Sequence, residues 1–186
     1  PYGSYENRFL YNRLDHIDDD KTFLGETGNF NGEDVIKIIA KQPATARFIA
    51  RHLSNYFVSD EPQVPAWQHV EPLHPELIKE LEDEYFRSGY ELKAMLRVLF
   101  NSDAFKNSGF AKVKNPSEMV CGTLRVVGDF TEPKPRFYDP ALEIRYMGQD
   151  LLNPPTVEGW HTGKEWIDSG TLVERVNFAA GEMGRV

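Results

Sequence analysis

Apolar side chains recur every three or four positions through much of the chain, and this spacing predicts amphipathic α-helices rather than strands. Five segments have it most clearly, each with one apolar stripe that we expect to pack in a core. Their apolar positions are Val35, Ile36, Ile38 and Ile39; Phe48, Ile49, His52, Leu53 and Tyr56; Leu77, Ile78, Leu81 and Tyr85; Leu92, Met95, Leu96, Leu99 and Phe100; and Met119, Val120, Thr123, Leu124 and Val127.

Polar residues predict where these helices begin and end. Asn31 with Asp34, and Asn115 with Glu118, have the spacing of an N-terminal cap and its partner at the third helical position. Gly89 follows the third stripe and can take the left-handed conformation that ends helices.

Two more helices are predicted nearer the C-terminus. One runs from Asp139 to Met147, and the last starts at Ser169 or Thr171 and carries Leu172, Val173 and Val176. Between them, residues 153–168 contain two prolines, two glycines and two tryptophans, which predicts a long aromatic loop. Such loops carry function more often than helices do.

Two other segments lack helical spacing. Residues 8–11 and 22–25 flank an acidic turn and predict a short N-terminal hairpin. Residues 58–73 contain three prolines and predict a surface loop, despite Trp67. The fold class expected from the whole pattern is mainly α, an irregular helical bundle of about six to seven helices.

Length and composition indicate one ordinary globular domain. The chain has 186 residues, of which 40% are apolar and 27% charged. We expect residues 1–186 to form a single helical domain, with an irregular lead-in at 1–30, helical hairpins at 31–106, and C-terminal helices with the aromatic loop at 115–178. Because the chain begins with Pro1 rather than Met, we also expect it to be a fragment of a longer protein.

Charge and cysteine content exclude several classes of protein. The net charge is -8, from 29 acidic and 21 basic residues, so the field of the protein should repel nucleic acid. No run approaches the roughly 18 apolar residues of a membrane-spanning helix. The single cysteine, Cys121, cannot form an internal disulfide, and we expect it to be buried in the stripe of its helix.

A series of short motifs occurs in a fixed order along the chain. The motifs are residues 21–25, 27–35, 46–51, 88–92, 112–118, 147–149, 153–155, 159–160, 166–167 and 177–178. Together they resemble the bacterial domain-of-unknown-function family numbered eighteen hundred. The resemblance runs from His16 to Phe178 and implies the C-terminal portion of a longer bacterial protein that is exported to the periplasm or cell exterior. It implies no catalytic residue, because no activity defines the family.

The densest cluster of metal-ligand types lies near the N-terminus. His16, Asp18 and Asp20, with two neighbouring aspartates, could bind calcium, magnesium or zinc through imidazole and carboxylate groups. The segment lacks the glycine and glutamate of a calcium-binding EF-hand loop. A solvated acidic turn is the favoured interpretation, with a metal site as the alternative.

Two arginines one helical turn apart form a second candidate. Arg47 and Arg51 could together bind a carboxylate, phosphate or sulfate. The competing interpretation is internal pairing with Glu33, Asp34 or Glu118, and we favour it because ion-pair networks are the commoner use of such arginines.

The aromatic loop gives the third candidate. Trp160, His161 and Trp166, together with Tyr138 and Tyr146, could form a stacking platform for a sugar ring. They could equally fill the core, which we consider the more frequent outcome for such residues.

Two hypotheses of function remain at this stage. The first is a non-catalytic module of a larger protein that binds a partner protein or a polysaccharide through the aromatic loop. The second is part of a metal-dependent hydrolase whose site the N-terminal part of the longer protein completes. Motifs for serine or zinc hydrolases are absent from the sequence. Convergence of His161, Arg47, Arg51 and the acids near His16 in one cleft would favour the hydrolase.

Overall fold

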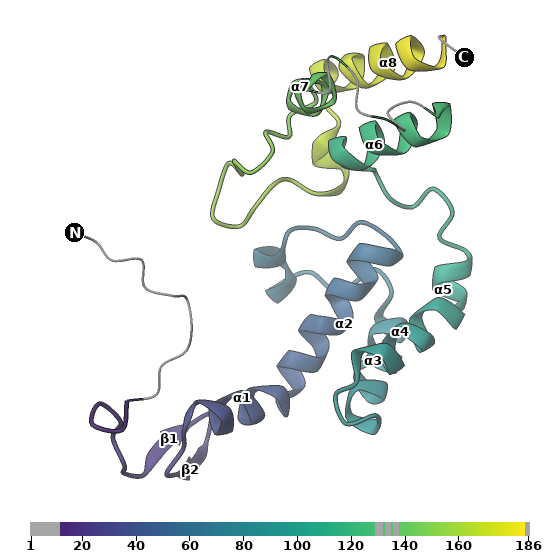
Figure 1. Ribbon diagram of the computed structural model, residues 1–186. Coiled ribbons are helices and arrows are strands. Elements are labelled where there is room, and N and C mark those ends of the chain that lie inside the picture. Colours follow the sequence, from purple (N-terminus) through teal and green to yellow (C-terminus); the bar gives the residue numbers. More distant parts are fainter. Residues whose placement is uncertain (1–11, 129–131, 133–134, 136–137, 185–186) are drawn as a thin grey trace, which may run out of the picture. The chain divides into compact units, whose positions relative to one another are not determined.

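The computed structural model describes residues 12–128, 132, 135 and 138–184, which form eight α-helices, two 3-10 helices and one β-hairpin (Figure 1). The predicted mainly-α, irregular helical bundle is confirmed. Contacts group the chain into two compact units, the first ending at Thr45 and the second beginning at Ala46, and each is described by itself. The single domain expected from the sequence stays a prediction.

The first unit contains the predicted short hairpin. Strand β1 (Lys21–Phe23) pairs antiparallel with β2 (Glu26–Gly28). Leu24 and Gly25 connect them, and both have positive φ, as the tightest hairpin turns require. Strand β1, which contains Thr22, therefore pairs with β2, the next strand along the chain. The partner segment expected from the sequence, residues 8–11, lies outside the described residues.

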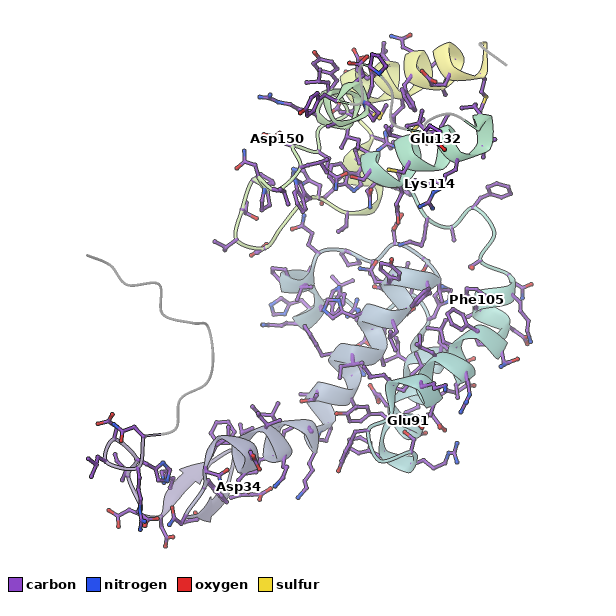
Figure 2. All side chains as sticks on the ribbon, in the orientation of Figure 1. Asp34, Glu91, Phe105, Lys114, Glu132 and Asp150 are labelled. Carbon is purple, nitrogen blue, oxygen red and sulfur yellow. The ribbon has the colours of Figure 1, made fainter. Side chains whose placement is uncertain are left out.

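Helix α1 (Gly32–Ala40) completes the first unit. It begins at the predicted capping box, in which Asn31 accepts from the Asp34 amide and Asp34, labelled in Figure 2, accepts from the Asn31 amide. The predicted apolar stripe is wrong in part, because Ile38 is buried but Ile36 and Ile39 are exposed. At about 100° per residue, these positions spread around too much of the helix to face one neighbour.

The second unit includes most of α2 (Pro43–Phe57), together with α3 (Pro75–Arg87), α4 (Leu92–Asn101) and the short α5 (Asp103–Lys106). The predicted face of α3 is confirmed, and Gly89 has φ +71 after its end. These helices share a core made of Ala46, Ala50, Val58, Leu77, Ile78, Leu81, Tyr85, Met95 and Leu99.

The predicted stripe of α2 is partly wrong. Phe48 and Tyr56 are exposed, and the helix is buried along Ala46, Ala50 and Ser54. Small side chains let neighbouring segments approach the helix closely, whereas the larger rings remain on its other side. In the following segment, which was expected to be a surface loop, Val58, Ser59 and Glu61 are also buried, and residues 64–68 form a 3-10 helix, η1 (Val64–Gln68).

A second core of the same unit joins α6 (Pro116–Val127), α7 (Asp139–Tyr146) and α8 (Ser169–Met183). Its buried residues are Val120, Leu124, Ile144, Met147 and Phe178. The capping box of Asn115 and Glu118 is confirmed at the start of α6. Cys121, expected to be buried, is exposed because it lies beside the buried stripe of α6.

Helix α8 begins at Ser169, one of its two predicted starts, and Asp168 caps it. The apolar residues expected on this helix, Leu172, Val173 and Val176, are exposed, whereas Arg175 and Phe178 are buried. None of the helices in the described ranges combines the length and apolarity needed to cross a membrane.

Candidate functional site

A pocket of about 590 Å³ lies in the second unit, between the end of α2, the segment that leads into α6, and the aromatic loop. This volume is typical of small-ligand sites. Aromatic rings and polar groups share its walls. The aromatic residues are Tyr56, Phe57, Trp160 and Trp166, and the polar residues include His52, Asn55, Asp60, Lys112, Asn115, Glu118, Gln149 and His161.

Asp60 holds two of these walls together. Its Oδ2 accepts a hydrogen bond from the Val113 amide at 2.7 Å, and its Oδ1 accepts from Lys112 Nζ at 3.0 Å. Lys112 Nζ also donates to the Asn55 carbonyl at 2.6 Å. The end of α2 is therefore tied to the segment that precedes α6, in which Figure 2 labels Lys114.

Gly163 places the aromatic loop in close contact with Asp60. It has φ +57, and a Cβ at this position would lie 2.8 Å from Cβ of Asp60. Real Cβ contacts do not come this close, so the contact requires a glycine. Gly163 begins the 3-10 helix η2 (Gly163–Trp166), which carries Trp166 into the pocket wall.

All three predicted loop residues, Trp160, His161 and Trp166, line the pocket. Trp166 is buried, and its ring meets that of His161 edge to face at 6.1 Å. His161 Nδ1 lies 3.2 Å from Glu165 Oε2, which also accepts from Gln63 Nε2 at 2.9 Å. The loop is thereby fixed to the 58–73 segment.

Trp160 differs from Trp166 in its hydrogen bonding. Its ring is half-buried, and its Nε1 is shielded from water with no hydrogen-bond partner in the structure described. A buried indole N–H normally has a partner, and leaving it without one costs free energy. This N–H is therefore an unsatisfied donor in a residue that lines the pocket. Tyr138 and Tyr146, which the sequence grouped with the loop, are exposed and are not part of the pocket lining.

The paired arginines do not line this pocket. Arg51 is buried and donates to Glu61 Oε2 at 2.8 Å, while Arg47 lies 3.1 Å from Glu71 and 3.8 Å from Glu82. Both arginines are paired internally, with acids other than those expected from the sequence. Each of these acids comes from the 58–73 segment or α3, whose proximity to α2 only the fold reveals.

The acidic turn belongs to the first unit. Asp18 and Asp20 are exposed, and Asp18 Oδ1 accepts a hydrogen bond from Asn29 Nδ2. His16 is partly buried and makes a contact of its own. Among the described residues, no three His, Cys, Asp or Glu side chains form a group that could hold a metal ion.

His52 lines the pocket, whereas the sequence indicated it only as a position of an apolar stripe. Burial lowers its pKa below the ordinary value, which favours the neutral imidazole. Its ring lies 4.3 Å from that of Phe48 and 4.6 Å from that of Trp67. The sequence missed Asp60, because its interactions join residues more than fifty positions apart.

The structure defines a mainly helical protein with an aromatic pocket held together by Asp60. The chain belongs to the family described as protein of unknown function (DUF1800), whose model matches residues 3–183. This confirms the family resemblance seen in the sequence. Neither the curated proteins nor the solved structures include a significant match.

Proposed function

We propose that this protein is a non-catalytic carbohydrate-binding module and that the aromatic pocket holds a sugar ring. The observation that carries the proposal is Trp160, which lines a pocket with aromatic walls and whose indole N–H has no hydrogen-bond partner in the structure described. A sugar ring has an apolar C–H face that packs on aromatic rings, and its hydroxyl oxygens accept hydrogen bonds from donors such as this N–H.

Binding rather than hydrolysis is supported by what the pocket carboxylates do. Glycoside hydrolysis ordinarily uses two carboxyl groups, one as acid and one as base or nucleophile. Both oxygens of Asp60 accept hydrogen bonds from Val113 and Lys112, and Glu118 Oε2 accepts from the Asn115 amide at 2.9 Å. Asp60 holds the pocket walls together and Glu118 completes the capping box of α6, and these structural roles favour a binding site.

The test is calorimetric titration of the protein with a panel of soluble oligosaccharides of differing sugar and linkage. Trp160→Ala should weaken binding at least about tenfold, because both ring and donor are lost. Trp160→Phe, which retains an aromatic ring, should weaken binding about two- to tenfold through the lost hydrogen bond.

Tyr146→Ala is the matched control, since Tyr146 is an exposed aromatic residue outside the pocket lining, and it should bind as the unaltered protein does. The proposal is wrong if no oligosaccharide of the panel binds. It is also wrong if folded Trp160→Ala protein binds with unchanged affinity.

A further inference from the structure

The pocket continues into a row of rings on the outer face of α2. Phe48, His52 and Tyr56 are spaced four residues apart and so share one side of the helix. Trp67 of η1 joins them, with its ring 6.0 Å from that of Phe48. We call Phe48, His52 and Trp67 the α2 platform. Because His52 also lines the pocket, the platform and the pocket form one continuous surface.

Two contacts fix the Trp67 ring of the platform in place. Trp67 Nε1 donates to the Pro62 carbonyl at 2.7 Å, and the guanidinium carbon of Arg51 lies 4.8 Å from the Trp67 ring centre. Arg51 is itself fixed by the buried ion pair with Glu61. Phe48 nevertheless remains 50% exposed. Rings fixed in advance lose little conformational entropy on binding, which favours a role in recognition.

Three cations in the described part of this surface are each paired with an acid. Arg51 pairs with Glu61, Arg47 with Glu71, and Lys112 with Asp60. His52 is favoured in its neutral form because burial lowers its pKa. Each of these acids offsets the charge of its cation, so the surface carries little excess positive charge for a sulfate or carboxylate group of a ligand.

From this geometry we infer that the ligand is a linear, uncharged polysaccharide, with one sugar in the pocket and the next units of the chain packed along the α2 platform. The inference rests on the proposed function and adds to it the length and charge of the ligand. Successive rings on the helix give a polymer several stacking positions, whereas a single sugar would use the pocket alone.

The experiment compares disaccharides with hexasaccharides of neutral β-1,4-linked glucose, mannose and N-acetylglucosamine, and with oligogalacturonate as the acidic counterpart. For at least one neutral series, the hexamer should bind about tenfold more tightly than the dimer, because two or more further stacking contacts form. Phe48→Ala should remove most of this length advantage, because it should weaken binding of the hexamer more than binding of the dimer.

Phe48→Leu retains apolar bulk in the fold and should lose the same length advantage, while Tyr146→Ala should retain it. The inference is overturned if dimers and hexamers bind equally, if both Phe48 variants keep the length advantage, or if the acidic hexamer binds more tightly than the neutral ones. Binding of dimers that depends on Trp160 would then leave the proposed function intact. Absence of binding to the whole panel would overturn the proposed function as well.

Discussion

Arg51 and Glu61 form an ion pair from which water is excluded, with Nη2 of the arginine 2.8 Å from Oε2 of the glutamate and side chains 2% and 0% exposed. Each partner also fastens the backbone of the 58–73 segment. Arg51 Nη1 donates to the Val70 carbonyl at 2.7 Å, and Glu61 Oε1 accepts from the Leu73 amide at 2.9 Å. The pair therefore attaches the 58–73 segment to α2.

Arg51→Met should lower the free energy of unfolding by about 3–5 kcal/mol, because it leaves the Glu61 carboxylate buried without its counter-charge. Urea unfolding followed by circular dichroism measures the loss. Arg47→Met is the matched control on the same helix. Its ion pair is half exposed, so the change should cost less than about 1 kcal/mol. Equal losses in the two variants would contradict this account of the buried pair.

Gly163→Ala should both destabilise the protein and impair its pocket. The new Cβ would lie 2.8 Å from Cβ of Asp60, and the backbone has φ +57, which disfavours alanine. We expect a loss of about 1–3 kcal/mol in unfolding free energy. Ligand affinity should fall at the same time, since η2 carries Trp166 into the pocket wall.

Gly181→Ala provides the control for this substitution. Gly181 lies within α8, and nothing lies within 4 Å of the added Cβ. In this helical position, alanine should stabilise the protein by about 0.5–1 kcal/mol. A Gly163→Ala protein as stable as the unaltered one would show that the aromatic loop does not depend on its close contact with Asp60.

Structural features were predicted correctly from the sequence where they depend on residues close together in the chain. The capping boxes at Asn31 and Asn115 form because each cap and its partner are three residues apart. The face of α3 was predicted correctly because its apolar positions form one narrow stripe. Gly89 has its predicted positive φ for the same local reason.

Predictions fail where the buried face of a helix depends on its neighbours. On α2, the small residues Ala46 and Ala50 contact the core, and the larger ring of Phe48 is left outside. Of the candidate site, the sequence identified Trp160, His161 and Trp166. It could not identify Asp60 as the anchor, because its partner Lys112 follows 52 residues later.

Two substitutions on α8 test which of its faces is buried. Phe178→Ala should lower the unfolding free energy by about 3–5 kcal/mol, because it opens a cavity among Val120, Leu124 and Met147. Val176→Ala should change it by less than about 0.5 kcal/mol, since Val176 is 58% exposed. Chemical denaturation of both variants measures the difference. The reverse order would show that the face with Val176, rather than the face with Phe178, packs in the core.

The cap of α8 should make stability depend on acid pH through Asp168. Hydrogen bonds from the backbone amides of Thr171 and Gly170 and from the Thr171 hydroxyl lower the pKa of Asp168 below its ordinary value of 3.8, with the Thr171 amide the largest cause. A carboxyl whose pKa is lower in the folded state stabilises the fold at pH values above its unfolded pKa. This contribution is lost as the pH falls through the folded pKa.

Asp168→Asn tests this dependence, because asparagine also caps helices but carries no charge. At about pH 7 the unaltered protein should melt at a higher temperature than the variant, since its ionised cap also interacts favourably with the helix dipole. The difference should shrink as the pH falls below about 4, where the cap takes up a proton. Melting curves followed by circular dichroism between about pH 7 and pH 2.5 provide the measurement, and a difference that stays constant across this range would show that the charge of Asp168 does not stabilise α8.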